Sequence, residues 1–365
     1  MTLKRIFALL VALALFGSLG ISSSTAASGP SLVAWQPWQD SQFDRAKREK
    51  RFILLDLEAV WCHWCHVMEK ETYNNPKVAD YIKQHYIAVK VDQDARPDIS
   101  KRYEDYGWPA TVVFNAEGKE IVKLRGYIPP ERMMAILTNI VEDPSPIVYI
   151  DQLRDNPTEI SKQPRLTDEL RAELTKRFYS THDYKLGGLN QDQKFMDRDS
   201  VELALMLAQK GDKKALEMAM QTLDGALNLI DPVWGGAYQY STDGDWDHKH
   251  FEKIMSVQTD YLKLYANAYR ITGEKRYEAA ARLIYRYVNE FLTSPEGGYF
   301  TSQDADLVPG EHSEDYFKLD NPSRRALGFP RIDTHVYTRE TAWMIAALAA
   351  VSQAFSVQTP LQEAI

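Results

Sequence analysis

The chain has 365 residues, of which 44% are hydrophobic and 26% charged, as in ordinary folded globular proteins of one or two domains. Its formal net charge of −8 and pI near 5.6 argue against a nucleic-acid-binding protein, which needs a basic face to neutralise phosphates. We therefore expect no nucleic-acid partner.

The first 27 residues have the pattern of a cleavable signal peptide. Lys4 and Arg5 precede an apolar run over residues 6–19, and the segment ends in the small residues Ser24-Thr25-Ala26-Ala27-Ser28. The run is too short to span a bilayer comfortably, so an uncleaved membrane anchor is the weaker alternative. No cysteine lies near the cleavage site to be acylated, which argues against a lipoprotein. We expect a soluble, exported protein, periplasmic or extracellular.

Residues 33–145 alternate between helical and strand patterns. Helices are predicted at 40–50, 62–72, 78–85, 98–106 and 129–141, and strands at 52–58, 86–91, 110–114 and 121–124, the last two joined by a hairpin turn. This alternation predicts a compact α/β domain with its active site at the C-terminal end of a strand.

The only two cysteines lie together in Trp61-Cys62-His63-Trp64-Cys65-His66, directly after the strand at 52–58. A helix that begins at Cys62 places this residue, exposed, at a positive helix end, which stabilises a thiolate. Cys62 is then the nucleophile, and Cys65 resolves the mixed disulfide. A disulfide that closes so small a loop stabilises a fold very little, so redox exchange is the better explanation of the pair.

The motif allows two other interpretations. Cys62-x-x-Cys65-His66 fits the pattern for c-type haem attachment, but a strand-to-helix turn offers no obvious haem cavity. A zinc site made by the two cysteines with His63 and His66 fails on geometry, because neighbours on one helix cannot converge on a tetrahedral centre. We expect neither a haem nor a metal. His63 more plausibly tunes the Cys62 thiolate, whereas His66 is equally well explained as an exposed or packed residue.

The order of these features resembles the thioredoxin superfamily. Trp61-Cys62-x-x-Cys65 follows a strand, Asp56 precedes the first cysteine by six positions, and Gly107-Trp108-Pro109 precedes a later apolar strand. The resemblance implies that Asp56 is a partly buried proton acceptor for Cys65, and that Pro109 is a cis proline touching the disulfide. The alternatives are a capping carboxylate and an ordinary trans proline.

A narrower resemblance is to the spermatogenesis-associated thioredoxin-like family. It rests on the block Trp61–Glu69 with Asp92, Arg96-Pro97-Asp98 and Gly107-Trp108-Pro109, is strongest over residues 33–145 and continues more weakly to about 350. The resemblance implies a second, all-α domain, an α/α toroid similar to six-hairpin glycosidases and sugar epimerases.

Residues 146–164 have the composition of a linker, and residues 165–365 are predominantly helical in pattern. Helices are predicted at 167–179, 200–209, 213–228, 254–271, 275–291 and 339–355, while strand patterns nearly vanish. Three glycine pairs, at 187–188, 235–236 and 297–298, predict equivalent loops of repeated α-hairpins. About six helices are visible where a full toroid has twelve, so we expect a truncated or half toroid.

A possible second site combines Trp246, His248, His250 and Glu252 with Asp304 and Asp306. The segments around His250-Phe251-Glu252 and Asp304-Ala305-Asp306 match motifs of the family named above. Paired carboxylates could hydrolyse or epimerise a sugar by donating and accepting protons. The alternative is that these residues cap helices and solvate a loop.

These patterns predict an exported thiol–disulfide oxidoreductase, or a redox-active binder, whose only redox group is the Cys62–Cys65 pair. Its partners would be protein thiols or disulfides and an upstream electron donor or acceptor. The chief rival is a carbohydrate-active or carbohydrate-binding protein with a regulatory thioredoxin-like domain. A third possibility is a scaffold whose helical half docks a partner.

Overall fold

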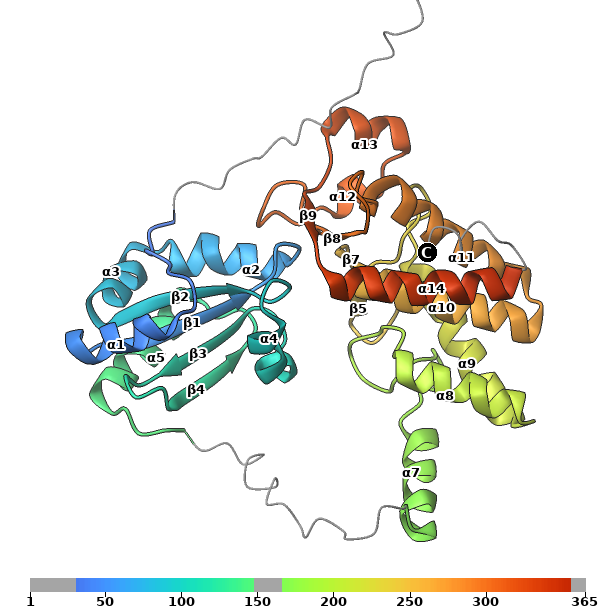
Figure 1. Ribbon diagram of the computed structural model, residues 1–365, viewed down its shortest axis with the longest axis horizontal. Helices are drawn as coiled ribbons and strands as arrows, with labels where there is room; N and C mark the ends of the chain where they lie inside the picture. Colours follow the sequence, from blue (N-terminus) through green and yellow to red (C-terminus); the bar gives the residue numbers. More distant parts are fainter. Residues whose placement is uncertain (1–30, 148–165, 356–365) are drawn as a thin grey trace, which may run out of the picture.

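The computed structural model describes residues 31–147 and 166–355, which form two lobes (Figure 1). The predicted signal peptide at 1–27 lies outside the described residues, as do most of the predicted linker and the last ten residues of the chain. The first lobe is built on one β-sheet, and the second is mainly helical, as predicted.

The sheet of the first lobe has the strand order β2-β1-β3-β4. β1 (Phe52–Glu58) lies in the middle, parallel to β2 (Tyr86–Asp92) and antiparallel to β3 (Ala110–Phe114), which forms a hairpin with β4 (Glu120–Arg125). Residues 53–57 of β1 are all buried, as expected for a strand covered on both faces. The strands at 52–58 and 110–114 are those predicted.

Helices cover both faces of this sheet. They are α1 (Asp40–Glu49), α2 (His63–Val67) continuing as a π-helix (Met68–Tyr73), α3 (Pro76–His85), α4 (Pro97–Tyr103) with a 3-10 turn (Glu104–Tyr106), and α5 (Pro130–Glu142). Leu54 packs in the core with Met68 and Leu137, whereas its neighbour Ile53 packs in the core with Ala46 and Ile99. Alternate residues of β1 thus enter separate cores, and Cys62 follows the end of this central strand.

The second lobe contains the six predicted long helices. They are α7 (Asp168–Ser180), α8 (Arg198–Gln209), α9 (Lys213–Ala226), α10 (Met255–Thr272), α11 (Lys275–Tyr287) and α14 (Thr338–Phe355), with a 3-10 turn (Leu227–Leu229) after α9 and a π-helix (Val288–Leu292) after α11. The buried faces of α8, α9, α10, α11 and α14 share one core around α10, which packs against α8, α11 and α14. Consecutive helices pack as α-hairpins, α8 with α9 and α10 with α11.

The expectation that strands nearly vanish in this lobe was wrong. The structure has β5 (Tyr240–Thr242), β6 (His248–His250), β7 (Lys253–Ile254), β8 (Phe300–Gln303) and β9 (Ile332–Val336), and two short helices, α12 (Glu314–Phe317) and α13 (Asn321–Leu327). β5 pairs with β6, and β8 lies between β7 and β9. Strands of two to five residues are too short to show a clear alternation in sequence.

The three glycine-pair loops are equivalent, as predicted. Each loop begins with a polar residue: Asp183, Asp231 or Ser294. The backbone carbonyl of this residue accepts a hydrogen bond from the amide of the first glycine, and its amide donates one to the carbonyl of the second glycine. Both glycines of every pair have positive φ. At Gly235 a Cβ would lie 2.1 Å from the Leu283 carbonyl oxygen, so only glycine fits there.

The two lobes touch around the end of β1. The Ala305 amide donates a hydrogen bond to the Trp61 carbonyl at 3.4 Å, and Arg339 pairs with Asp94 at 3.1 Å. Within the ranges that the structure describes, no helix is both long and apolar enough to cross a bilayer.

Candidate functional site

Cys62 and Cys65 form a disulfide between β1 and α2, with an S–S distance of 2.14 Å and a Cα–Cα distance of 5.2 Å. Cys62 is the residue before α2, and its Sγ accepts a hydrogen bond from the Cys65 amide at 3.1 Å. The helix therefore begins one residue later than expected, but its first free amides still face the Cys62 sulfur. This geometry stabilises negative charge on Cys62 in the reduced protein.

The expectation that Cys62 is exposed was wrong, because only 3% of its surface is accessible and only 4% of that of Cys65. Ile254 and Val257 of the helical lobe pack in one apolar cluster with both cysteines and Trp108. Sequence reasoning missed this cover, since it comes from the other lobe.

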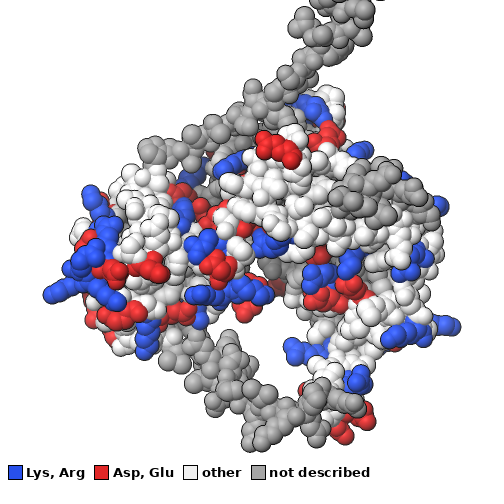
Figure 2. All heavy atoms as spheres, viewed as in Figure 1, with Lys and Arg blue, Asp and Glu red and all other residues white. Residues whose placement is uncertain are grey.

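A cleft of about 910 Å³ lies between the lobes and reaches this disulfide. Cys62 is among its lining residues, with the aromatic side chains of Trp61, Trp64 and Trp108 from the first lobe and Tyr240 and Tyr261 from the second. The space-filling view shows the boundary between the lobes hollowed, with acidic and basic side chains along it (Figure 2). A substrate can thus approach Cys62 along the cleft.

The Trp108–Pro109 peptide bond is cis, as the thioredoxin resemblance implied. Trp108 lines the cleft and packs in the cluster that holds both cysteines. The Gly107–Pro109 turn therefore lies beside the disulfide, where a substrate would dock.

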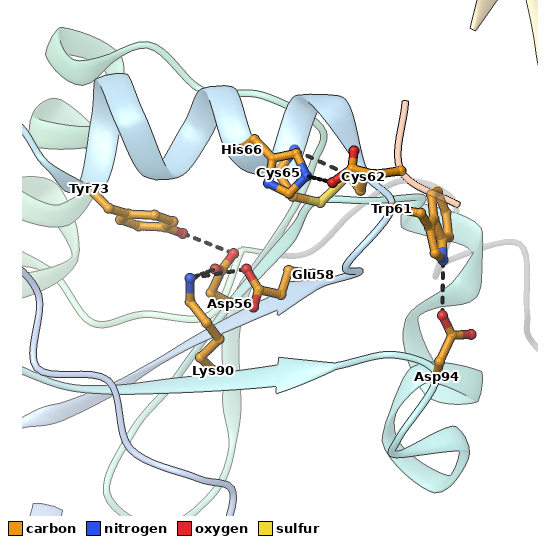
Figure 3. The surroundings of a disulfide bond; sticks show 10 residues. Asp56, Glu58, Trp61, Cys62, Cys65, His66, Tyr73, Lys90 and Asp94 are labelled. Carbon is orange, nitrogen blue, oxygen red and sulfur yellow. Dashed lines mark hydrogen bonds and ion pairs between the residues drawn. A yellow bond between two sulfur atoms is a disulfide. The ribbon is translucent and has the colours of Figure 1, made fainter. Parts of the chain in front are cut away.

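Asp56 is buried on β1, below the helix that carries the cysteines (Figure 3). Tyr73 donates a hydrogen bond to it at 3.3 Å, and the Lys90 ammonium lies 3.5 Å away. Burial raises the pKa of Asp56 above its usual value, although Lys90 opposes this. Such a carboxyl can hold a proton near neutral pH, as a proton acceptor for Cys65 must.

Lys90 was not predicted as a site residue. Besides Asp56, it pairs with Glu69 at 2.8 Å and with Glu58 at 3.0 Å. Burial disfavours its charged form, but the three carboxylates outweigh this and raise its pKa. Its position opposite Asp56 in the parallel register of β1 and β2 is the signal that could have revealed it.

Trp61 is fixed by a buried carboxylate. Its indole N–H donates to Asp94 at 2.9 Å, as Figure 3 shows, and Asp94 also pairs with Arg339 of the helical lobe. Burial raises the pKa of Asp94 to about 7. Asp94 was not predicted as a site residue, although it stands between Asp92 and Arg96-Pro97-Asp98, on which the narrower resemblance rests.

The two histidines of the motif bind the two aspartates predicted for a separate site. His63 Nδ1 lies 2.7 Å from Asp306 Oδ1, and His66 Nε2 lies 2.9 Å from Asp304 Oδ2. Burial alone would lower the pKa of His66, but the hydrogen bond to Asp304 outweighs this and raises it. The pKa of Asp304 is also raised, and there burial is the cause. The structure thus joins parts of two predicted sites into one interface.

His66, Asp304 and Asp306 could geometrically hold a cation, since their ligand atoms lie within 4.8 Å of one another. Each carboxylate oxygen nevertheless has a hydrogen-bond partner: His66 and the Asp306 amide for Asp304, and His63 and the Gly310 amide for Asp306. Hydrogen bonds between the two lobes therefore account for this group of three residues. That the site holds no metal remains a prediction.

Glu252 and His250 approach this bridge from the helical lobe. Glu252 is 3% exposed and lines the cleft, and its buried Oε2 has no hydrogen-bond partner. Burial raises its pKa to about 7, and Asp304 and Asp306 add to the effect. Burial, with His63 and His312 nearby, lowers the pKa of His250 to about 4; its ring stacks on Tyr240 at 4.2 Å.

Trp246 and His248 lie apart from this group. Trp246 is buried against Gly225, where a Cβ would lie 2.4 Å from its Nε1, and it donates to the Leu186 carbonyl. His248 is exposed and bonds Asp245 at 3.0 Å. The structure explains both through local packing.

Comparisons with known proteins agree with the two-lobed architecture. Residues 25–153 match the family model Thioredox_DsbH, described as a protein of unknown function, DUF255. Spermatogenesis-associated protein 20 of Mus musculus is 30% identical over 314 residues, which are 76% of this chain and 39% of that protein. The chain thus spans about two fifths of that relative's length.

Two further similar proteins match smaller shares of this chain. Thiol:disulfide interchange protein DsbD 2 of Pseudomonas aeruginosa is 30% identical over 105 residues, 28% of this chain and 18% of that protein. The crystal structure of a sugar epimerase from a ruminal bacterium has a TM-score of 0.40 and 16% identity, covering 54% of this chain and 52% of that one.

Proposed function

We propose that this chain, a member of the spermatogenesis-associated thioredoxin-like family, is a thiol–disulfide oxidoreductase that acts through Cys62 and Cys65. The observation that carries the proposal is the position of the disulfide: it lies between the central strand and α2, next to the cis peptide bond before Pro109. A purely structural bridge over three residues would contribute little to stability.

In the reducing direction, the Cys62 thiolate attacks one sulfur of a substrate disulfide R–S–S–R. A Cys62–S–S–R bond forms and one R–S⁻ leaves. The Cys65 thiol loses its proton, for which Asp56 is the acceptor, and its thiolate attacks the Cys62 sulfur. The second R–S⁻ leaves, the Cys62–Cys65 disulfide is restored, and two electrons have passed to the substrate. Oxidation of a dithiol substrate is the same sequence in reverse.

Two features support Cys62 as the attacking residue. It lines the cleft, and it precedes the free amides at the start of α2, which favour its thiolate. In a repeated cycle the chain needs two partners. One is a dithiol donor or a disulfide acceptor, and the other is a substrate in the opposite redox state. Export to an oxidising compartment, where such exchange is common, is part of this proposal.

Trapping of the mixed disulfide tests the proposal. Cys65→Ser, reduced and mixed with a dinitrophenyl-labelled cystine peptide, should retain one labelled peptide per chain, because the resolving thiol is missing. Cys62→Ser should retain none, since Cys65 is not among the residues that line the cleft. Equal trapping by both variants, or by neither, would overturn the assignment.

Two simpler measurements complement this test. In the reduced protein, iodoacetamide at about pH 6 to 7 should modify Cys62 well before Cys65, because only a lowered pKa leaves thiolate there. The purified protein should also show no Soret absorbance; a band that survives denaturation would indicate covalent haem instead.

Carbohydrate binding is the second candidate function. A cleft lined by aromatic rings and by the buried carboxylate of Glu252 supports it. Asp304 and Asp306, however, are bonded to the motif histidines, which leaves the proposed sugar chemistry without its carboxylate pair. Titration calorimetry with manno-, gluco- and galacto-oligosaccharides tests the candidate; binding that Glu252→Gln weakens would support it, and no heat with any sugar would reject it.

A further inference from the structure

The cover over the disulfide restricts the shape of its substrate. Cys62 is 3% exposed, and Ile254 and Val257 pack beside it from the helical lobe. A flat surface of a folded protein cannot reach a sulfur that lies behind two lobes. A small disulfide, or an extended chain segment lying in the cleft, can do so.

The lining of the cleft is acidic. Among the residues that the structure describes, six with carboxylate side chains and two arginines line it; the carboxylates are Glu104, Asp105, Asp197, Asp199, Glu252 and Asp260. Both lobes contribute acidic residues. A cleft with an excess of one charge attracts ligands of the opposite charge, more so where its walls are of low polarity.

The two arginines are already engaged. Arg198 pairs with Asp199 at 2.8 Å and with Asp260 at 3.8 Å. Arg125 donates to the Asp105 carbonyl. An anionic substrate would have to displace these partners. The same pairs occupy Asp199 and Asp260, so a cation would meet mainly the other four carboxylates of the lining.

Glu252 offers a specific acceptor within this lining. It is buried, it lines the cleft, and its Oε2 has no hydrogen-bond partner in the structure. Buried polar atoms are nearly always hydrogen-bonded, so a buried oxygen without a partner, on a residue that lines the cleft, indicates a place for a donor. Glu252 and Cys62 line the same cleft, and Ile254, two residues after Glu252, packs in the cluster that holds both cysteines.

The surrounding groups favour a charged donor. Burial raises the pKa of Glu252, His63 opposes this, and Asp304 and Asp306 add to the rise. Asp304 and Asp306 are bonded to His66 and His63, so Glu252 is the carboxylate of this group that is left for a positive ligand. Aromatic rings of Trp61, Trp64 and Trp108 also line the cleft, and ring faces attract ammonium and guanidinium groups.

We propose that this cleft is a binding site for an amine-bearing disulfide, whose ammonium group donates to Glu252 while its sulfur meets Cys62. The inference rests on the proposed oxidoreductase function and adds its substrate class. For a symmetrical diamine disulfide, attack by Cys62 releases one aminothiol, and attack by Cys65 on Cys62 releases the second. Both electrons come from the cysteine pair, so one turnover needs no other reductant.

Three disulfides of similar length test the charge preference: cystamine, 2-hydroxyethyl disulfide and 3,3′-dithiodipropionate, which are cationic, neutral and anionic. The full chain is reduced, freed of reductant and mixed with each, and re-formation of the Cys62–Cys65 disulfide is followed by quenching and mass spectrometry. Each rate is divided by that of dithiothreitol with the same compound, which removes differences in leaving-group reactivity.

We expect the corrected rate for cystamine to exceed that for 3,3′-dithiodipropionate by about tenfold or more, as for a close charge pair. The preference should shrink in high salt, which screens charges. Glu252→Gln should reduce it several-fold, because an amide keeps the shape but not the charge. The matched control is Glu217→Gln, an exposed residue of α9 outside the cleft lining, which should leave the preference unchanged.

The outcomes separate this inference from the function beneath it. Equal corrected rates, a preference for the anion, or a cystamine preference that Glu252→Gln leaves intact would overturn the charge selection while exchange still occurs. If none of the three compounds oxidises the reduced chain although dithiothreitol reacts with all, the proposed function itself fails. A cystine-linked peptide flanked by lysines distinguishes the source of the amine: faster reaction than cystamine identifies a peptide, and slower reaction a small molecule.

Discussion

His63 Nδ1 lies 2.7 Å from Asp306 Oδ1, although 243 residues separate them in the chain. His63 stands between the two cysteines, so the redox motif itself holds the helical lobe. Both side chains are buried, and the parallel contact of His66 with Asp304 doubles the link. The second lobe is therefore part of the redox site and not an independent appendage.

Removing the charge of Asp306 should loosen this link. Asp306→Asn keeps an oxygen for one neighbour but loses the charged partner of His63, a change that typically costs about 1–3 kcal/mol when the bond is buried. We expect lower stability in urea unfolding and faster reduction of the Cys62–Cys65 disulfide by a phosphine. Asp245→Asn is the matched control, because its bond to His248 is exposed and should contribute little. Equal losses in the two variants would contradict a domain-bridging role.

The bond between His66 and Asp304 predicts a pH dependence of stability. The folded-state pKa of His66 is raised, because Asp304 outweighs the effect of burial. A raised pKa of a histidine gives stability that is fully present below its unfolded value of about 6.5 and is lost as the pH rises through the folded value. Burial also raises the pKa of Asp304, so ionisation of this residue destabilises the folded state. Asp304, like His66, therefore makes the protein less stable as the pH rises.

Urea unfolding of the wild type and His66→Gln at a series of pH values measures this effect. Glutamine can still donate to Asp304 but does not titrate. We expect the wild-type advantage, on the order of 1 kcal/mol per unit of pKa shift, to be largest near pH 6 and to shrink toward pH 9. An advantage that stays constant or grows with pH would show that protonation of His66 plays no part.

Asp56 should act in the resolving step. Asp56→Asn removes the proton acceptor proposed for Cys65, so decay of the mixed disulfide on Cys62 should slow by about 100-fold or more, the usual contribution of a general base. Formation of the mixed disulfide should change much less. Stopped-flow measurement with a chromogenic disulfide separates the two steps. Glu58→Gln, which also removes a partner of Lys90, is the control; equal slowing there would assign the effect to Lys90.

The isolated first lobe should be less selective for substrate size. Residues 33–145 contain two hydrophobic cores of their own, so we expect them to fold alone. Without Ile254 and Val257, Cys62 would be open to solvent, and reduction of insulin should be several-fold faster than with the full chain. A small neutral disulfide, 2-hydroxyethyl disulfide, should react at similar rates with both. An isolated lobe that reduces insulin no faster than the full chain would show that the cover does not limit access.

Local sequence patterns were enough to predict the first lobe and the long helices of the second. The apolar run of β1, the cysteine pair after it and the glycine before Trp108-Pro109 are each properties of a few neighbouring residues. The six long helices show apolar residues at helical spacing, and the glycine pairs fix tight turns through their own φ angles. Such features depend on the chain within a few positions, so a sequence reports them directly.

Only the tertiary structure decided the environment of the cysteines. The burial of Cys62, the bonds of His63 and His66 to Asp306 and Asp304, and the unpaired oxygen of Glu252 all depend on how the second lobe faces the first. Periodicity tells which side of a helix or strand is buried, but not which distant segment covers it. Asp304 and Asp306 therefore stood in the sequence as an acidic pair, and the contact between the lobes made them partners of the redox motif.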